Sequence, residues 1–401
     1  MKAIILAAGP SERIKPFTET RAKPMIRMAG QTILETVLKS LREAGITEIV
    51  LVVSHKREGI ERYFEHGASL GMSIEYVVQE PIDGIGAGLI RCREHINSEP
   101  FMLVYGDVLA TGQPYTAVLE QHAECGAAVA ALSLPTASGE FGNVYLDNEM
   151  RITRLVEKPD NPHLSNYVFA GIFLLPAQIM DLLDKHGNDI EKVFHQMIEE
   201  RSIFGTFWEG GWIDVRRPWQ ILDANRMLMD KWDSAEIHAS VKMEGQVHIE
   251  GPVRIERNVV IGAGTVLKGP CYIGEDSYIG NNVLIRSYTS LGPGSIVGYG
   301  TELKNCVLFG KSVLGRLSYI GDSVIGEDVH LGTGVATVNH LPDGGIIPSV
   351  SEQGQLSTGM TKVGAFIGDG VIIGARQVIA PGARIKAGHR EPDLITVKSV
   401  I

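Results

Sequence analysis

Apolar residues follow two different patterns along the chain, and the change falls near residue 230. In residues 1–230 short apolar runs alternate with amphipathic stretches; the first three are a strand over 4–7, a helix over 33–44 and a strand over 49–53. Strands alternating with helices predict a mostly parallel sheet that helices cover on both faces. The first part of the chain is therefore expected to be an α/β domain, with ligands bound beyond the carboxyl ends of its strands.

Further elements of this domain are predicted from the same alternation. Pro218 is expected at the first position of a connector helix that runs to about Trp232. The other expected strands are 74–78, 101–105, 128–133, 142–146, 152–156 and 167–174, and the other expected helices are 58–66, 88–96, 179–185 and 190–200.

Between residues 236 and 401, apolar residues recur at every sixth position over long stretches. A helix cannot keep such a period on one face, whereas a three-sided parallel coil can, with one apolar residue of each side pointing inward. We therefore predict a parallel β-helix, and we expect residues 333–360, which break the period, to form an extruded loop. The positions spaced six apart are Ile255, Ile261, Leu267, Ile273, Ile279, Ile285, Leu291, Val297 and Leu303, and the period returns at Ile325, Leu331, Ile367, Ile373, Ile379 and Ile385.

Composition narrows the classes of protein that remain. The 401 residues are 44% hydrophobic and 21% charged, with a formal net charge of −10, which argues against a general nucleic-acid binder. No run of about twenty apolar residues predicts a membrane span, and the first apolar run is too short for a signal peptide. Cys92, Cys125, Cys271 and Cys306 lie far apart and are expected to be buried thiols in a reducing, cytoplasmic compartment.

The first strand leads into a loop that carries two cations. Gly9 ends the apolar run, and Arg13 and Lys23 follow within the loop. A strand, a tight turn and then Arg and Lys favour phosphate binding, although an ordinary strand–turn–helix remains the alternative. Neither G-x-x-x-x-G-K-[ST] nor G-x-G-x-x-G is present here.

Two aspartates stand at strand ends. Asp107 follows a buried strand and Gly106, and Asp214 lies in the run Gly210-Gly211-Trp212-Ile213-Asp214. Each is a candidate metal ligand, and for Asp107 the alternative is a turn or the cap of a helix.

Taken together, these residues resemble the sugar-1-phosphate nucleotidylyltransferase family. The signature runs from Leu6-Ala7-Ala8-Gly9 through Arg13, Pro16 and Thr18 to Lys23-Pro24. Within the family the chain most resembles archaeal two-domain proteins with a hexapeptide-repeat, acyltransferase-like second domain. Their bacterial counterpart is the bifunctional N-acetylglucosamine-1-phosphate uridylyltransferase/glucosamine-1-phosphate acetyltransferase. The resemblance implies a Rossmann-like nucleotidyltransferase domain and a left-handed parallel β-helix that associates as a homotrimer or a multiple of it.

The resemblance also implies a reaction and a set of site residues. An NTP and a sugar-1-phosphate would give an NDP-sugar and pyrophosphate with Mg²⁺, and UTP or dTTP with glucose- or N-acetylglucosamine-1-phosphate is favoured. The implied residues are Arg13 and Lys23 for catalysis, Leu6, Ala8, Gly9, Gln79 and Gly84 for the nucleotide, Gly142, Glu157, Lys158 and Gly171 for the sugar phosphate, and Asp107 and Asp214 for the metal.

Several residues depart from the family pattern. Ser11 replaces a loop Gly, Ala22 a Pro, Ile85 a Thr and Phe169 an Asn, and Arg216 stands where Gly is common. The cations and metal ligands are retained while the sugar pocket is altered, so we expect altered specificity rather than inactivity.

In the coil, the resemblance implies an acetyltransferase site with acetyl-CoA as a second substrate. Its residues would be Arg286, Lys304, Arg316, Tyr319, Asn339 and Lys362. Arg316, however, stands where the family has its catalytic His, and a guanidinium cannot accept the proton of an amine. His330 and His340 are more simply explained as surface or stacking residues. Three alternatives remain: a nucleotidylyltransferase with a structural coil, a bifunctional enzyme that also acetylates an amino-sugar-1-phosphate, and a non-catalytic subunit that senses nucleotide sugars.

Overall fold

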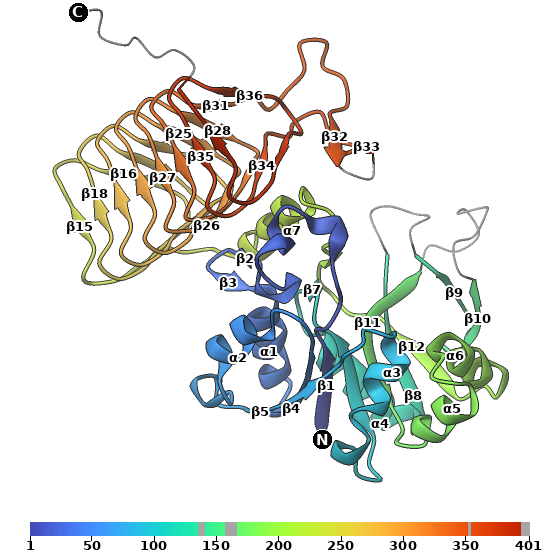
Figure 1. The fold of residues 1–401 in the computed structure, drawn as a ribbon. Coiled ribbons are helices and arrows are strands. Elements are labelled where there is room, and N and C mark those ends of the chain that lie inside the picture. The colour runs from blue at the N-terminus through green and yellow to red at the C-terminus, as the bar shows by residue number, and fades with distance from the viewer. Residues whose placement is uncertain (135–140, 157–166, 352–353, 394–401) are drawn as a thin grey trace, which may run out of the picture. The chain divides into compact units, whose positions relative to one another are not determined.

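The computed structural model describes residues 1–134, 141–156, 167–351 and 354–393 (Figure 1). Contacts divide the chain into two compact units. The first consists of Met1–Pro10, Ala22–Met25 and Ile33–Asp214, and the second of Ser11–Arg21, Ile26–Thr32 and Val215–Ile401. The expected boundary near residue 230 follows the change of apolar pattern, whereas these units follow contacts, so the helix α7 (Gln220–Met229) belongs to the second unit.

The first unit is built on a seven-stranded sheet. All neighbouring strands are parallel except β11, which runs antiparallel to both β6 and β8. This confirms the predicted mostly parallel sheet. The strand order is β12 (Ile203–Thr206), β8 (Ala128–Ser133), β11 (Val168–Leu175), β6 (Phe101–Tyr105), β1 (Lys2–Leu6), β4 (Glu48–Val53) and β5 (Ser73–Val78).

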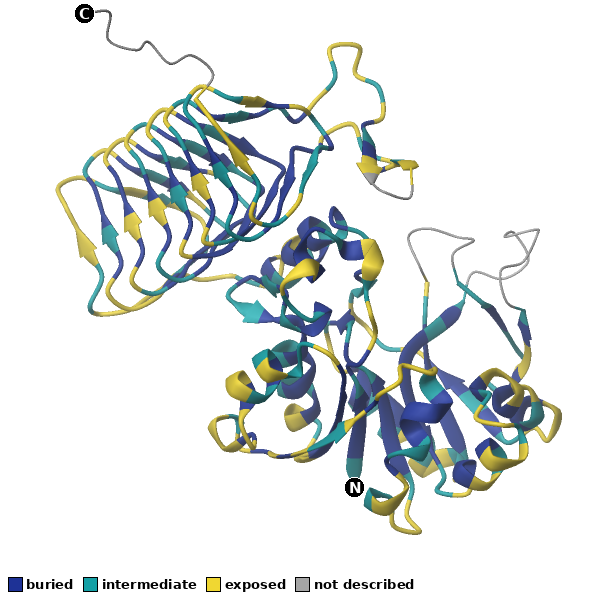
Figure 2. Cartoon of the chain, viewed as in Figure 1, coloured by how far each residue is buried: buried dark blue, intermediate teal, exposed yellow. Residues whose placement is uncertain are grey.

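Helices cover both faces of this sheet because side chains alternate along each strand. In β1, Ala3 and Ile5 pack in one core cluster and Ile4 packs in the other. The strands are accordingly buried between the helices (Figure 2). One face carries α1 (Ile33–Glu43), α2 (Arg57–Phe64) and α4 (Pro114–Cys125), and the other carries α3 (Ile85–Ile90), α5 (Ile179–Lys185) and α6 (Ile190–Glu199).

Some elements differ from the predictions. The helix α4 was not predicted, since Tyr115 and Val118 are among its few buried apolar positions. The helix expected over 88–96 begins earlier, as α3, and ends in a separate 3₁₀ turn, Arg93–His95. Helix α7 begins at Gln220 rather than at Pro218. Two small antiparallel pairs, β9 (Asn143–Leu146) with β10 (Ile152–Val156) and β7 (Val108–Ala110) with β13 (Trp212–Asp214), complete the unit.

The coil of the second unit is a left-handed parallel β-helix with three sheets, as predicted. Successive strands go to successive sheets, so each strand pairs in parallel with the one a full turn later. The first sheet holds β14 (Glu236–Ile237), β17 (Val253–Ile255), β20 (Cys271–Ile273), β23 (Thr289–Leu291), β26 (Val307–Gly310), β29 (Val324–Glu327), β34 (Phe366–Ile367) and β37 (Arg384–Ile385). The second holds β15 (Lys242–Met243), β18 (Val260–Ile261), β21 (Tyr278–Ile279), β24 (Ile296–Val297), β27 (Val313–Leu314), β30 (His330–Leu331), β35 (Ile372–Ile373) and β38 (Arg390–Glu391). The third holds β16 (His248–Glu250), β19 (Val266–Lys268), β22 (Leu284–Ile285), β25 (Glu302–Lys304), β28 (Tyr319–Gly321), β31 (Ala336–Thr337) and β36 (Val378–Ile379).

The inward positions of the coil are the residues of the six-residue period. All nine consecutive positions lie in one buried core cluster. The apparent frame shift has a simple cause: Leu303 is followed inward by Leu308, and Ile320 by Ile325, so two corners are one residue shorter. Thr337 fills an inward position with a hydroxyl, which accepts a hydrogen bond from the Gly321 N–H at 3.0 Å.

The extruded loop begins later than expected. Strand β31 continues the coil to Thr337, and the insertion that follows carries a β-hairpin of β32 (Pro348–Ser351) and β33 (Gly354–Ser357). The insertion ends before Phe366, where β34 resumes the first sheet.

The segment Ser11–Arg21, which lies within the loop after β1, packs on the coil. Phe17 is fully buried, with its ring centroid 5.1 Å from that of Phe309. The Arg21 guanidinium lies 4.8 Å from the Phe309 centroid and forms an ion pair with Asp369. The Glu19 carboxylate accepts a hydrogen bond from the Ala387 N–H at 2.8 Å. The small hairpin of β2 (Arg27–Met28) and β3 (Gln31–Thr32) belongs to the same unit.

The four cysteines are free thiols. Burial raises the pKa of Cys92, Cys271 and Cys306 to about 12, so these thiols stay protonated at neutral pH. Cys125 is only half-buried, contrary to expectation. No helix among the described residues has the length and apolar character needed to span a membrane.

Candidate active site

The two predicted metal ligands lie together at one edge of the first unit. Asp107 precedes β7, and Asp214 ends β13; the antiparallel pairing of these strands sets Asp214 opposite Val108. The Lys23 ammonium lies between the two carboxylates, 2.8 Å from Asp107 Oδ2 and 3.2 Å from Asp214 Oδ1. Three predicted site residues far apart in sequence therefore meet at one point.

This trio is largely shielded from solvent. The side chains of Lys23, Asp107 and Asp214 are 5%, 36% and 13% exposed. The charges of Lys23 and Asp214 are shielded enough that they need a partner, and each has one within the trio, whereas Asp107 stays partly open to solvent. Two carboxylate oxygens directed at one cation are also a donor set that Mg²⁺ accepts, because it commonly takes one or two carboxylates together with water and substrate phosphate. No larger cluster of three or more His, Cys, Asp or Glu side chains suited to a metal occurs in the described residues.

A cavity of about 230 Å³ opens beside Asp107. All five residues predicted for nucleotide binding line it, and they come from the end of β1 with the turn that follows and from the segment after β5. Ile85, which the sequence analysis noted as a replacement of Thr, also lines it, together with Ile82 and Tyr105, which the sequence did not identify. The full lining is Leu6, Ala8, Gly9, Gln79, Ile82, Gly84, Ile85, Tyr105 and Asp107.

The amide of Gln79 is held in one orientation. Its Nε2 donates to the Gly84 carbonyl at 2.8 Å and to Asp83 Oδ1 at 3.1 Å. Asp83 in turn accepts two hydrogen bonds from Arg91, each of 3.0 Å, and these bonds lower the pKa of the Asp83 carboxyl below its usual value. Gly88 lies against the Gln79 carbonyl: a Cβ there would be 2.9 Å from Oε1. The side chain is thus pre-oriented at the cavity.

Gly171 lies next to a side chain of the neighbouring strand. Its φ of +77° lies in the left-handed region, and a Cβ would come within 2.8 Å of the Tyr105 ring. The absence of a side chain at Gly171 therefore leaves room for the Tyr105 ring, which itself lines the cavity. No motif marks Tyr105, because an aromatic residue at a strand end looks like ordinary core.

The remaining predicted residues of this site do not line this cavity or lie outside the described residues. Gly142 directly precedes β9. Glu157 and Lys158 lie outside the described residues. Arg13 belongs to the 3₁₀ turn Glu12–Ile14 of the second unit, where it lines a different cavity.

The coil has a strongly basic cavity of about 660 Å³. Arg286 follows β22 and Lys304 ends β25, which are strands of the third sheet at successive turns, and Lys362 comes from the end of the insertion. Arg226 and Lys268 also line the cavity, so five cations surround it.

A buried carboxylate, Asp322, organises this corner of the coil. Its side chain is 6% exposed and receives Lys304 Nζ at 3.1 Å, Asn305 Nδ2 at 2.7 Å and the Asn339 amide. Asn339 Nδ2 also donates to the Tyr319 hydroxyl at 3.1 Å. Burial, followed by the charge of Asp322, raises the pKa of Tyr319. Five of the six predicted acetyltransferase residues therefore line the basic cavity or join the network at its wall.

Arg316 is not part of this group. It follows β27, a strand of the second sheet, whereas Arg286 and Lys304 end or follow strands of the third sheet, so Arg316 lies at another corner of the coil. His330 and His340 are exposed, as expected for surface residues.

Comparisons with known proteins agree with this organisation. The family model described as Nucleotidyl transferase matches residues 2–231, and one described as GMPPB C-terminal domain matches residues 267–341. The chain is 32% identical over 400 residues to a bifunctional protein GlmU of Methanocaldococcus jannaschii, covering 96% of this chain and 92% of that protein. It is 34% identical over 404 residues to a bifunctional sugar-1-phosphate nucleotidylyltransferase/acetyltransferase of Sulfurisphaera tokodaii, covering 97% and 95%.

A solved structure shows the same fold for the first part of the chain. It is described as a glucose-1-phosphate thymidylyltransferase of Bacillus anthracis in complex with sucrose, and it matches with a TM-score of 0.53 at 22% identity. The match covers 56% of this chain and 94% of that one.

Proposed function

The chain belongs to the nucleotidyl transferase family, of the sugar-1-phosphate type, and we propose that it joins an NTP and a sugar-1-phosphate into an NDP-sugar with release of pyrophosphate. The observation that carries the proposal is the convergence of Lys23, Asp107 and Asp214 at a cavity lined by all five expected nucleotide residues. UTP or dTTP with glucose- or N-acetylglucosamine-1-phosphate are the proposed substrates, and the cytoplasm is the proposed compartment.

The reaction requires cations more than it requires acids or bases. A phosphate oxygen of the sugar-1-phosphate attacks the α-phosphorus, a new P–O bond forms, and the bond to the β-phosphate breaks as pyrophosphate leaves. Two polyanions must be brought together, so charge neutralisation and alignment supply most of the rate. Lys23 would stabilise the α-phosphate in the transition state, and Arg13 the departing pyrophosphate.

Asp107 and Asp214 would hold the metal that this chemistry uses. Mg²⁺, when bound, neutralises phosphate oxygens and fixes their orientation. Until substrate is present, the Lys23 ammonium keeps the two carboxylates close together, at 2.8 and 3.2 Å from its nitrogen. Lys23 thereby has a positioning role as well as the proposed contact with phosphate.

Gln79 would read the nucleotide base, because a fixed amide can offer hydrogen bonds of defined direction. Gly142, Glu157, Lys158 and Gly171 would contact the sugar phosphate. The apolar Ile85 lines the cavity at the position where the family commonly has Thr, which supports altered selectivity.

Pyrophosphate release from a panel of NTPs crossed with hexose and aminohexose phosphates tests the proposal. We expect one NTP and one sugar phosphate to exceed the others clearly, with loss of activity on chelation of divalent ions. Absence of pyrophosphate from every pair would contradict the proposal and favour the alternative, a non-catalytic sensor of nucleotide sugars.

A second activity, acetylation of an amino-sugar-1-phosphate, is suggested by the two-activity names of the relatives and by the cations of the basic cavity. The chemistry needs a base, and Arg316 cannot serve. Asp322 already accepts hydrogen bonds from three side chains, so its carboxylate oxygens are engaged with those donors rather than directed at a substrate amine. We expect no thiol release from acetyl-CoA with any amino-sugar phosphate, and release of free thiol would establish the second activity.

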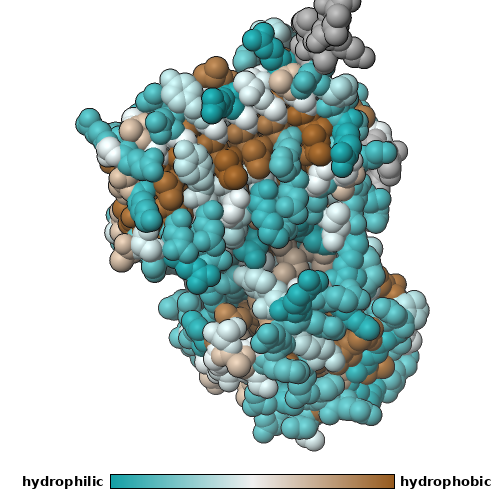
Figure 3. Space-filling model, turned by 60° about the vertical axis from the view of Figure 1, so that its left-hand side comes forward, coloured by the Kyte–Doolittle hydropathy of each residue, from teal (hydrophilic) through white to brown (hydrophobic). Residues whose placement is uncertain are grey.

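We also propose that the coil associates with further copies of the chain as a homotrimer or a multiple of it. The outward positions of the second sheet form a row of large residues that includes Val260, Tyr278, Ile296 and Val313, and hydrophobic residues gather in a band on the coil surface (Figure 3). Tyr278 and Ile296 are 43% and 42% exposed. Light scattering would give the subunit number, and we expect Ile296→Asp to reduce it.

A further inference from the structure

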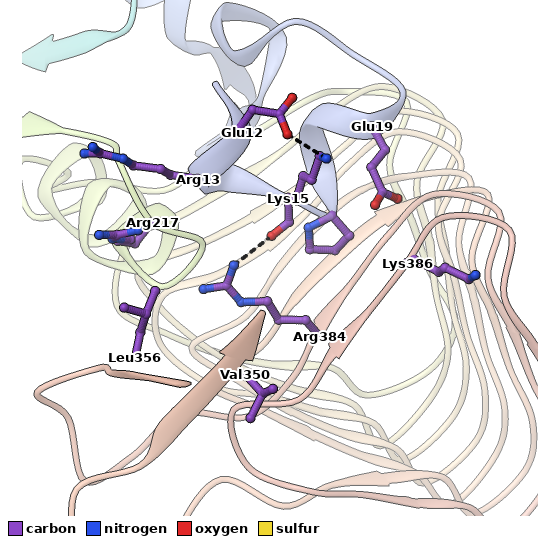
Figure 4. Close-up of a pocket in the computed structure, with 10 residues that line it drawn as sticks. Glu12, Arg13, Lys15, Glu19, Arg217, Val350, Leu356, Arg384 and Lys386 are labelled. Atoms are coloured by element: carbon purple, nitrogen blue, oxygen red, sulfur yellow. Dashed lines mark hydrogen bonds and ion pairs between the residues drawn. The ribbon is translucent and has the colours of Figure 1, made fainter. Parts of the chain in front are cut away.

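A cavity of about 260 Å³ in the second unit is not explained by the proposed acetyltransferase or nucleotide residues (Figure 4). Three parts of the chain form it: the 3₁₀ turns after Gly9, the start of α7, and the coil with its inserted hairpin. We call it the hairpin cavity and define it by its basic residues Arg13, Lys15, Arg217, Arg384 and Lys386. The apolar residues Val350 and Leu356 of the hairpin close one side.

The charges of the hairpin cavity are unbalanced. Five cations line it against two acids, Glu12 and Glu19. Both acids are already engaged, since Glu12 pairs with Lys15 at 2.6 Å and Glu19 accepts the Ala387 N–H at 2.8 Å. A cavity with this surplus of positive charge attracts small polyanions.

Arg384 has a donor without an acceptor. Its Nε donates to Ser349 Oγ at 2.9 Å and one terminal nitrogen donates to the Lys15 carbonyl at 3.3 Å. The other terminal nitrogen, Nη2, is buried and has no hydrogen-bond partner among the described residues. A buried guanidinium N–H without an acceptor costs free energy, because the group has lost its hydrogen bonds to water. Such a donor often marks the place where a ligand binds. Burial, and then the charge of Arg217, lower the pKa of Arg384, as expected where positive charge is crowded.

We propose that the hairpin cavity binds a diphosphate group, with Arg384 Nη2, Arg217 and Lys386 as the donors. A guanidinium offers two parallel donors to a phosphate, and cations from two segments of the chain can bracket two phosphates at once. The proposal rests on the proposed function only for the source of the ligand: pyrophosphate and the NDP-sugar are both products of that reaction, and both carry a diphosphate.

Arg13 makes such binding relevant to turnover. It lines the hairpin cavity and is also the residue proposed to stabilise the departing pyrophosphate. A diphosphate held here would compete for the Arg13 guanidinium, so we expect the occupied site to slow nucleotidyl transfer as product accumulates.

Calorimetric titration of the full chain, in chelator without divalent ions, tests the site directly. The probes are inorganic pyrophosphate, a UDP-sugar and inorganic phosphate, and the melting temperature is recorded with and without each. Arg384→Met and Lys386→Ala should each weaken diphosphate binding about tenfold or more, since each removes a charged donor. Arg390→Met is the matched control, because Arg390 is an exposed arginine of the same coil that does not line the cavity.

The binding of the three probes to the wild-type chain and its variants decides whether the hairpin cavity is a diphosphate site. Pyrophosphate binding that both cavity variants weaken and the control retains supports the site, and binding of the UDP-sugar alone supports it with the NDP-sugar as its source. Equal affinity in all variants, no binding, or equal binding of inorganic phosphate overturns it. Arg384→Met removes the hydrogen bonds of Arg384 to Ser349 and Lys15 together with its charge. Lys386→Ala removes a charge but leaves these hydrogen bonds in place, so it separates loss of charge from loosening of the hairpin. Binding needs no turnover, so an inactive protein that binds pyrophosphate here would contradict only the proposed function.

Discussion

The two carboxylate clusters described above differ in how their oxygens are used. In the first unit, Asp107 and Asp214 direct their oxygens at one ammonium, that of Lys23. In the coil, a single carboxylate, Asp322, receives one ammonium and two amides. Two carboxylates that share one ammonium can bind a metal ion instead, while the ammonium binds a phosphate. A single carboxylate that already accepts hydrogen bonds from three donors has no such alternative role. The first arrangement suits chemistry and the second suits the stability of a coil corner.

The largest expected effect comes from removing a carboxylate of the first cluster. Asp107→Asn should lower turnover about a hundredfold or more, because charge stabilisation by a bound metal is worth several kcal/mol in the transition state. Pyrophosphate release at saturating Mg²⁺ measures it, with Asp181→Asn on the exposed face of α5 as control. Turnover within about threefold of wild type would remove Asp107 from the metal site.

Removing the shared cation should have the next largest effect. We expect Lys23→Ala to lower turnover at least about tenfold, more than about 1.4 kcal/mol of barrier. The measurement is pyrophosphate release, with the melting temperature recorded to separate catalysis from folding. Lys39→Ala, which breaks an ion pair with Glu35 on α1, is the control, and near-wild-type release in the Lys23 variant would contradict its role.

The coil cluster should respond in stability and leave nucleotidyl transfer unchanged. Asp322→Asn should cost about 2 kcal/mol, because it removes the charge from hydrogen bonds that Lys304 and two amides make. Calorimetric melting measures the loss. Asp328→Asn is a matched control, since Asp328 is an exposed corner residue with a positive φ, as Asp322 has. A fall in pyrophosphate release with no change in melting would break the comparison.

The smallest expected effect concerns Asp223 of α7, a carboxyl whose environment resembles neither cluster. Burial raises its pKa, and the charge of Arg226 opposes this only in part. The pKa of this carboxyl is therefore higher in the folded protein than its unfolded value of about 3.9. Its protonated form stabilises the fold at pH values below the unfolded pKa, and this stabilisation is lost as the pH rises through the folded pKa. Asp223→Asn should therefore raise the melting temperature relative to wild type more at pH 7 than at pH 4. An equal difference at both pH values would contradict the assignment.

Much of the fold could be predicted because the geometry of strands, helices and the coil fixes how far apart the buried apolar residues lie in the sequence. One residue per side of the coil reaches the interior, so the six-residue period and the buried core are the same set of positions. The five expected nucleotide residues likewise end or follow strands β1 and β5, whose carboxyl ends lie at one edge of the sheet. The family and the nucleotidyltransferase fold were confirmed by the comparisons.

Other features could not be predicted from local pattern. Tyr105 lines the cavity only because Gly171 on the adjacent strand leaves room for its ring. Arg316 and Lys304 look like neighbours in sequence, yet successive strands go to different sheets, which sets them at different corners. Helix α4 has few buried apolar positions, so its amphipathic pattern is weak.

The sequence by itself determined the two architectures, because the periodicity of apolar residues is a local property of the chain, and its resemblance to a known family implied the reaction class and the residues of the first cluster. Only the tertiary structure decided that Ser11–Arg21 packs on the coil, with Phe17 against Phe309, while Lys23 belongs to the first unit. It also decided that the donor Arg384 Nη2 is buried in a cavity that Arg13 and Arg217 line, with no hydrogen-bond partner in the described part of the chain. Burial and the pairing of donors with acceptors depend on contacts between distant segments, and no local pattern encodes them.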